Sequence, residues 1–258
     1  ALEGEFEPAL AVEVAVARAG WWFFLFSRFV VMTRRHYLWA ALLVGGGLAT
    51  LGFASRPETG PEPRLTRSTA GPAPRNLTGL AVATFAGGCF WSHEETFEEV
   101  RGVRAVVSGY AGGTQRNPTY EQVASQTTGH AEAVQVYYDP KQVSYQQLLN
   151  VFFLGAHDPT QLNRQGPDKG PEYRSVAFYR TPQERQLIQA TIRRIDAAHR
   201  YPAPIVTQVQ GFTEFWPAES YHQGYYRLHP TQPYISRVSR PKVEHFRQEF
   251  PQLLKNPL

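Results

Sequence analysis

The sequence predicts an α+β fold, a two-layer sandwich in which helices pack on one mixed β-sheet. Two observations carry this prediction. Short apolar runs of strand type alternate with segments whose apolar residues recur at helical spacing, between residues 80 and 250. Gly, Pro and Asn residues separate these segments, as expected at turns. The length of 258 residues allows one such domain together with extensions.

The first half of this domain alternates strands and helices. The helix expected at 144–156 opens with a capping box, Ser144 and Gln147. A long loop rich in Gly, Pro and polar residues then covers 155–173, and loops of this length inside a compact domain are usually functional. The other predicted elements here are strands at 80–85, 103–110 and 131–138, a helix at 92–100 and a short helical turn at 119–124.

The second half begins with a strand predicted at 174–180. Thr181 and Glu184 form a second capping box with Pro182 at the first helical position, and the helix should run to about residue 199. After it we expect a strand at 205–210, an aromatic segment with histidines at 212–229 and a C-terminal helix near 242–250.

The N-terminal part of the chain has a different character. A basic stub with Arg34 and Arg35 precedes an uncharged, apolar run at 37–54, which predicts a secretory signal peptide or, alternatively, an uncleaved membrane anchor. Met32 is the only methionine and lies where such a signal would start. The Pro-rich stretch 55–79 predicts a disordered linker. We therefore expect an N-terminal extension over 1–54, a catalytic domain over 80–258, and a protein that is exported or anchored in a membrane, on its periplasmic or extracytoplasmic side.

Charge and cysteine content narrow the range of functions. The net charge of +4 is spread without long basic runs, so we expect no nucleic-acid partner. A single cysteine excludes an internal disulfide and Cys-x-x-Cys metal or redox sites. The histidines lack the pairing of metal ligands, so we expect no metal and no cofactor, and we interpret His222 as a hydrogen-bonded structural residue.

The single cysteine, Cys89, follows Gly87 and Gly88 between a predicted strand and a predicted helix. The two glycines allow a sharp turn, which places Cys89 at a helix N-terminus. Free backbone N–H groups and the positive end of the helix dipole favour a thiolate at such a position. The alternative is an inert cysteine that is buried as a small hydrophobic residue.

Glu132 is the second candidate for chemistry. Alternation along the strand 131–138 places it on the same face as Val134 and Val136. Burial there would raise the pKa of its carboxyl group and suit a general acid near neutral pH. The alternative is that Ala131 and Ala133 mark the apolar face and Glu132 is solvated.

Short motifs along the chain resemble the peptide methionine sulfoxide reductase A family, in the family's order and spacing over about 80–226. The resemblance implies an α+β sandwich and reduction of the S epimer of methionine sulfoxide, peptide-bound or free, to methionine. The motifs are Gly87-Gly88-Cys89-Phe90-Trp91, Gly109-Tyr110-Ala111-Gly112-Gly113, Asn117-Pro118-Thr119-Tyr120, Thr128-Gly129-His130-Ala131-Glu132-Ala133-Val134, Tyr138-Asp139-Pro140, His157-Asp158-Pro159, Gln165-Gly166-Pro167-Asp168 and Tyr173-Arg174-Ser175.

The family's chemistry maps onto two of these motifs. By resemblance, Cys89 is the nucleophile that attacks the sulfoxide sulfur, and Glu132 is the acid that protonates the sulfoxide oxygen as the S–O bond breaks. Elementary chemistry agrees, because the oxygen of a sulfoxide leaves only once it is protonated.

The resemblance also implies roles for five further residues. Tyr120 and Tyr173 resemble phenols that hydrogen-bond the sulfoxide oxygen, and Asp168 resembles a carboxylate that orders the site through water. Phe90 and Trp91 resemble the pocket for the substrate's methyl group, where contacts between sulfur and aromatic rings are favourable. The alternatives are core packing for the two apolar aromatic residues and surface or structural roles for the other three.

The chain departs from many family members in lacking further cysteines that would resolve the sulfenic acid. We therefore predict a single-cysteine enzyme whose Cys89 sulfenic acid is resolved by an external thiol, from a glutaredoxin/glutathione system or a thioredoxin-like donor. We expect a monomer. Two other functions stay open: a thiol peroxidase that uses Cys89, and a non-catalytic module that binds sulfoxides.

Overall fold

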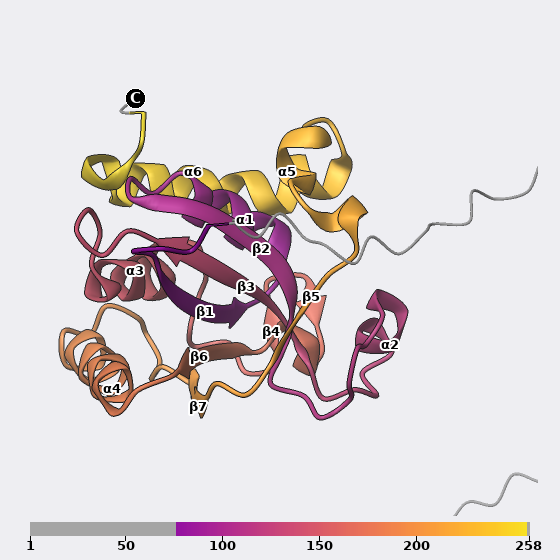
Figure 1. Cartoon of the computed structure of the whole chain (residues 1–258), viewed down its shortest axis with the longest axis horizontal. Coiled ribbons are helices and arrows are strands. Elements are labelled where there is room, and N and C mark those ends of the chain that lie inside the picture. Colours follow the sequence, from indigo (N-terminus) through magenta and orange to yellow (C-terminus); the bar gives the residue numbers. More distant parts are fainter. Residues whose placement is uncertain (1–75, 257–258) are drawn as a thin grey trace, which may run out of the picture. The chain divides into compact units, whose positions relative to one another are not determined.

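Within the residues that the computed structural model describes, 76–256, six strands form one sheet in the order β7-β6-β1-β3-β2-β8 (Figure 1). Neighbouring strands are antiparallel except β6 and β7, which are parallel, so the sheet is mixed as predicted. The strands are β1 Ala81–Gly87, β2 Val103–Ala111, β3 Ala131–Tyr138, β6 Ser175–Tyr179, β7 Gln208–Gly211 and β8 Phe215–Pro217.

The longer helices pack on this sheet and on one another. Helix α1 packs on β2 and β3, α6 packs against α1, and α4 packs against β6 and α3 (Figure 1). The arrangement confirms an α+β fold. The α-helices are α1 Phe90–Glu98, α2 Tyr120–Ala124, α3 Tyr145–Val151, α4 Pro182–Ala197, α5 Tyr225–Leu228 and α6 Arg240–Glu249, with π-helical turns at Phe152–Ala156 and Ile235–Ser239.

Both faces of the central strands are buried. On the face that the helices cover, Phe85 stacks on Phe97 and Phe152, with ring centroids 5.3 and 4.7 Å apart. Because residues alternate along β3, Glu132 shares the face of Val134 and Val136, which belong to this main core. A smaller cluster consists of Ala86, Ala111, Ala131, Ala133, Val176 and Phe178.

The predicted helix at 144–156 is confirmed in its start and differs in its end. Ser144 and Gln147 form the predicted reciprocal capping box. Helix α3 ends at Val151, and the chain continues as a π-helical turn to Ala156. Periodicity does not separate the two helix types over so few residues.

The predicted loop 155–173 contains short structure of its own. Strands β4 Arg164–Gln165 and β5 Asp168–Lys169 pair around a turn, and a 3-10 helix covers Pro171–Tyr173. Two-residue strands are too short to show alternation, so the sequence pattern gave no sign of them. The hairpin matters because it carries Gln165 and Asp168.

Two boundaries in the second half differ from the prediction. The hydroxyl of Thr181 caps α4 by accepting from Glu184 N at 3.1 Å, but the Glu184 carboxylate accepts from Arg180 N, so the second capping box is not reciprocal. Strand β7 begins at Gln208 rather than at residue 205, because Ile205 N donates to the Asp196 carboxylate instead of to a strand.

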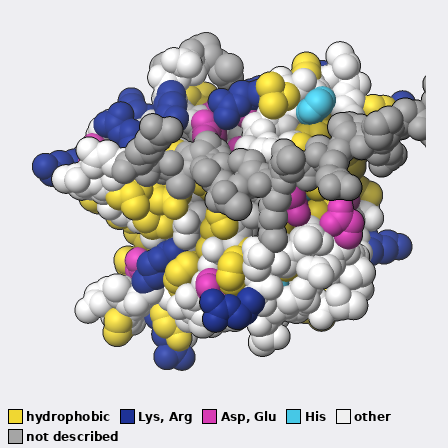
Figure 2. Space-filling view, turned by 45° about the vertical axis from the view of Figure 1, so that its right-hand side comes forward, with side chains coloured by type: hydrophobic (Ala, Val, Ile, Leu, Met, Phe, Trp, Pro, Cys, Tyr) yellow, Lys and Arg dark blue, Asp and Glu magenta, His cyan; other side chains and the backbone are white. Residues whose placement is uncertain are grey.

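The surface shows how the charge of the chain is distributed. On the face drawn in Figure 2, Lys and Arg side chains lie at several separate places among acidic, apolar and other polar groups. This face therefore carries its basic residues without gathering them all into one patch.

The predicted apolar run 37–54 and the linker up to residue 75 lie outside the described residues. Among residues 76–256, no helix has the length and apolar character required to cross a membrane.

Candidate active site

Cys89 lies at the sharp turn between β1 and α1, as predicted. It is the N-cap of α1 and directly follows Gly88, whose φ of +101° falls where side chains are rarely tolerated. A Cβ at Gly88 would lie 2.7 Å from the Cβ of Gln165, and one at Gly87 would lie 2.8 Å from Nε2 of His93. The turn and the neighbouring Gln165 therefore require a glycine at 88, and close neighbours alone require one at 87.

The environment of Cys89 favours the thiol over the thiolate. The residue is only 6% exposed, and this burial raises the pKa of its thiol, as does the charge of Glu132. The backbone N–H of Trp91 and the phenol of Tyr234 lower the same pKa but do not outweigh burial. Burial of Cys89 therefore opposes the thiolate that the helix N-terminus is expected to favour.

Glu132 has the properties predicted for a general acid. It is 4% exposed, and its Oε2 accepts a hydrogen bond from Phe90 N at 3.0 Å. Burial raises the pKa of its carboxyl group to about 8; the Phe90 N–H opposes this shift, while the charges of Asp168 and Glu172 add to it. Glu132 is therefore a neutral acid at pH 7.

A cavity of about 220 Å³ brings all seven predicted site residues together. It opens at the junction of β1, α1, β3 and the β4–β5 hairpin, so the residues come from separate parts of the chain. Its lining consists of Cys89, Phe90, Trp91, Tyr120, Glu132, Asp168, Tyr173, Gln232 and Tyr234.

Two phenols in the cavity are suited to donate hydrogen bonds. Burial raises the pKa of Tyr120 to about 12, with a further contribution from the charge of Glu132, and the same two causes raise the pKa of Tyr173. Both phenols therefore keep their protons near neutral pH.

Aromatic side chains build one wall of the cavity around Trp91. Its ring stacks on Tyr225 with centroids 3.9 Å apart, and its Nε1–H donates to Nδ1 of His222 at 3.2 Å. Burial lowers the pKa of His222 to about 4, so its imidazole is neutral and able to accept. His222 is a hydrogen-bonded structural residue, as predicted. Phe90 is buried, and its ring centroid lies 5.0 Å from that of His222.

Tyr234 and Gln232 line the cavity although sequence reasoning did not select them. The Tyr234 hydroxyl donates to Oδ2 of Asp168 at 2.6 Å, and its ring meets Trp91 edge-on at 5.8 Å. The resemblance to the family ends near residue 226, so the sequence offered no motif for this segment. A tyrosine in an otherwise polar stretch was the only available signal.

Comparison with known proteins places the chain in a family. A family model described as peptide methionine sulfoxide reductase matches residues 81–254. The chain belongs to this family. It is 49% identical over 175 residues to peptide methionine sulfoxide reductase MsrA 2 of Mesorhizobium japonicum. The aligned region covers 68% of this chain and 90% of that relative. It is also 48% identical over 174 residues to peptide methionine sulfoxide reductase MsrA of Thermus thermophilus. This aligned region covers 67% of this chain and 97% of that relative.

Solved structures agree with this assignment. The reduced form of Mxr1 from Saccharomyces cerevisiae matches with a TM-score of 0.57 at 30% identity, over 61% of this chain and 90% of that one. Methionine sulfoxide reductase A of Corynebacterium diphtheriae matches with a TM-score of 0.54 at 32% identity, over 66% of this chain and 93% of that one. The α+β architecture and the family assignment therefore agree.

Proposed function

We propose that this protein reduces the S epimer of methionine sulfoxide to methionine in the cavity around Cys89. Membership of the peptide methionine sulfoxide reductase family supports the reaction. The observation that carries the proposal is the pairing of Cys89 with a neutral, buried Glu132, which is anchored by the N–H of Phe90, the residue next to the cysteine.

The proposed reaction starts from two protonated groups. The Cys89 sulfur bonds to the sulfoxide sulfur while Glu132 gives its proton to the sulfoxide oxygen, and the thiol proton passes to the Glu132 carboxylate, so the acid is restored. The bonds from the substrate sulfur to oxygen and to the Cys89 sulfur then break, and the hydroxyl moves to the Cys89 sulfur. Methionine leaves, reduced by two electrons, and Cys89 becomes a sulfenic acid, oxidised by two.

The other side chains of the cavity bind the substrate in this proposal. The phenols of Tyr120 and Tyr173 donate to the sulfoxide oxygen, and Asp168 holds Tyr234 and ordered water beside it. Trp91 and Phe90 receive the S-methyl group, because sulfur and methyl groups pack favourably on aromatic faces. An aromatic wall for the methyl group and hydrogen-bond donors for the oxygen would favour one epimer of the sulfoxide. The substrate is methionine sulfoxide in a peptide or as the free amino acid.

Regeneration of Cys89 requires a thiol from another molecule. The sequence contains no second cysteine, so the sulfenic acid reacts with an external thiol to give a mixed disulfide and water. A second thiol then releases Cys89. We propose a glutaredoxin/glutathione or thioredoxin-like donor.

We also propose that the chain is exported or anchored by its apolar run at 37–54, which supports this only as a sequence pattern. Cell fractionation of the full chain, with N-terminal sequencing of the recovered protein, tests it. A full-length chain in the soluble cytoplasmic fraction would contradict the proposal.

A single-turnover reaction without reductant tests the catalytic proposal. The chain is mixed separately with the two epimers of an N-acetyl methionine sulfoxide peptide, and Cys89 is trapped as sulfenic acid for mass spectrometry. We expect one equivalent of methionine from the S epimer and one sulfenic acid per chain. A sulfenic acid formed only with peroxide would favour a thiol peroxidase, and sulfoxide binding with no methionine would favour a binding module.

A further inference from the structure

A buried ammonium group lies close to the active site without a defined role. Lys242 is in the first turn of α6, and its Nζ is buried with no hydrogen-bond partner and no ion pair among residues 76–256. Leaving a buried cation without a partner is costly, so its place needs an explanation.

Lys242 lines a second cavity, of about 370 Å³, together with His157 and Gln165. These two residues also contact the cysteine turn. A Cβ at Gly87 would lie 2.9 Å from the His157 ring, and one at Gly88 would lie 2.7 Å from Gln165. No residue lines both cavities, and the second one borders the turn through His157 and Gln165, on the side that we call behind the turn. The other titratable residues that line it are Asp158, Tyr201 and His245.

The charges that act on Lys242 are those of the active site. Burial lowers the pKa of its ammonium, while Cys89, Asp168 and Glu132 raise it when they are ionised, with Cys89 the largest of the three. In return, Lys242 lowers the pKa of the Cys89 thiol and of Glu132. The titratable neighbours His93 and His157 are both buried, and burial lowers the pKa of each, so they add no positive charge behind the turn.

We infer that Lys242 is a positioning residue whose buried positive charge stabilises the negative charge on the Cys89 sulfur as the thiol ionises for attack. This inference rests on the proposed function and deepens it. In the structure, burial favours the protonated thiol, and Nζ has no hydrogen-bond partner among the described residues. When the thiol proton leaves, the ammonium behind the turn supplies the charge that the helix N-terminus alone does not.

The pH dependence of Cys89 alkylation tests this role without any sulfoxide. Cys89 is the only cysteine, so iodoacetamide reports on it alone. We expect Lys242→Met to raise the midpoint of the alkylation profile by about one pH unit, and to slow alkylation about tenfold below that midpoint. Lys242→Arg keeps the charge and should stay within about threefold of wild type. Lys141→Met, an exposed lysine after β3, should leave the profile unchanged.

The outcomes separate this inference from the proposed function. A Lys242→Met protein that folds, judged by near-ultraviolet circular dichroism, and keeps the wild-type profile would overturn the role of Lys242, whether or not it reduces sulfoxide. A shifted profile in a chain that forms no methionine would instead contradict the proposed function alone.

A second measurement covers the case in which Lys242→Met does not fold. Lysine side chains labelled at Cε with carbon-13 are titrated by NMR in the wild type and in Cys89→Asp, with the Lys242 signal assigned by its loss in Lys242→Arg. We expect Lys242 to titrate at higher pH in Cys89→Asp, because a carboxylate places a negative charge where the wild type has a neutral thiol. Identical Lys242 titrations in the two proteins would overturn the inference.

Discussion

The same burial has opposite chemical consequences for the two central residues. It favours the protonated form of Glu132, which the proposed reaction needs, and it favours the protonated form of Cys89, which the proposed reaction must overcome. The two effects fit one mechanism only if the proton moves in a cycle. In the proposed mechanism Glu132 gives its proton to the substrate and takes the one that Cys89 loses, so Cys89 and Glu132 never carry negative charges at the same time.

The first prediction concerns Glu132→Gln, which keeps the shape and loses the acidic proton. We expect the single-turnover rate of methionine formation to fall about 10²- to 10⁴-fold, the usual contribution of a general acid. In the wild type the rate should also fall as pH rises through about 8, because the pKa of Glu132 is raised and the reactive form is the protonated one.

Rapid-quench kinetics from about pH 6 to about pH 10 measure both effects, and an isosteric change at an exposed glutamate serves as the control. Glu121→Gln, on α2, should have the rate and pH profile of wild type. A Glu132→Gln protein with the wild-type rate would exclude Glu132 as the proton donor.

Site residues that lie in short motifs could be predicted from the sequence. Site residues that reach the cavity from segments far along the chain could not. Cys89 and Glu132 lie in motifs with local signals, a glycine turn and an alternating strand. Tyr234 and Lys242 reach the site only because 231–242 returns to it after the last recognised motif. The balance between helix dipole and burial at Cys89 was also out of reach, since burial depends on residues far along the chain.

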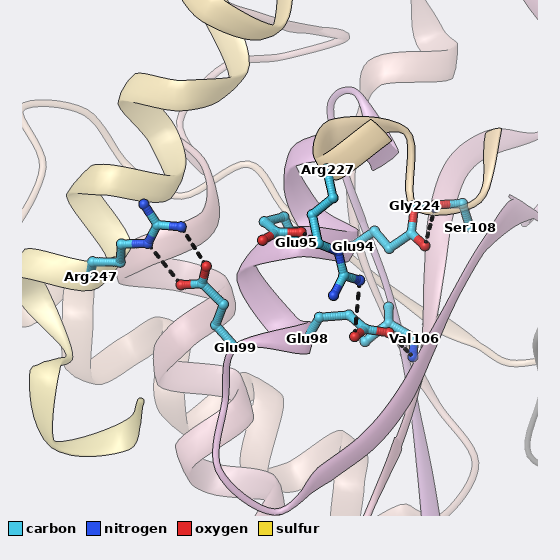
Figure 3. A network of polar contacts seen from close by, with 9 residues as sticks. All are labelled: Glu94, Glu95, Glu98, Glu99, Val106, Ser108, Gly224, Arg227 and Arg247. Carbon is cyan, nitrogen blue, oxygen red and sulfur yellow. Dashed lines mark hydrogen bonds and ion pairs between the residues drawn. The ribbon is translucent and has the colours of Figure 1, made fainter. Parts of the chain in front are cut away.

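At the scale of elements, α1 carries the nucleophile but has no side-chain cap and no acid in its first turn. Four glutamates at its C-terminal half hold it instead (Figure 3). Glu94 accepts from Ser108 Oγ of β2 at 2.9 Å and from Gly224 N, next to α5, at 2.8 Å. The remaining contacts are Arg227 with Glu95 and Glu98, Val106 N with Glu98, and Arg247 of α6 with Glu99.

This anchoring was not visible in the sequence. Consecutive acidic residues on a helix predict a solvated face, yet Glu94 and Glu95 are buried, and burial raises the pKa of Glu94 to about 7. The partners lie on β2, α5 and α6, so only the folded arrangement brings them together. The strands and longer helices were predictable because each buries a regular apolar pattern, whereas short β8 was not.

The second prediction concerns the pair between α1 and α6. Arg247→Met should lower the free energy of unfolding by about 1 kcal/mol and the melting temperature by about 2–4 °C, because Arg247 binds both oxygens of Glu99. Thermal denaturation followed by circular dichroism measures the change.

A matched pair on the same helix provides the control. Arg200 pairs with Glu249 of α6 but is 51% exposed, compared with 29% for Arg247, so Arg200→Met should cost less than about 0.5 kcal/mol. Equal losses for the two variants would mean that the Arg247 pair has no special part in holding α1.

At the scale of the whole molecule, the site is assembled from segments between Cys89 and Lys242, and Cys89 is the single cysteine of the sequence. The turn between β1 and α1 supplies Cys89, the proposed nucleophile, and β3 supplies Glu132, the proposed acid. The β4–β5 hairpin supplies Asp168, and 231–242 supplies the groups around and behind the sulfur. Cys89 is buried and lines the cavity, so in the proposed mechanism an external thiol reaches the oxidised sulfur through the substrate cavity. Product release therefore has to precede regeneration.

The last prediction follows from this order of events. Without thiol, the chain should release one methionine per molecule and then stop, with Cys89 as a sulfenic acid and no intramolecular disulfide. Added glutathione should give a mixed disulfide at Cys89, and a glutaredoxin-type or thioredoxin-like donor should then restore turnover. Non-reducing gels and intact-mass spectrometry follow each state, with Cys89→Ser as the inactive control. Repeated turnover of the pure chain without any thiol would contradict the mechanism, because the sequence provides no second cysteine to resolve the sulfenic acid.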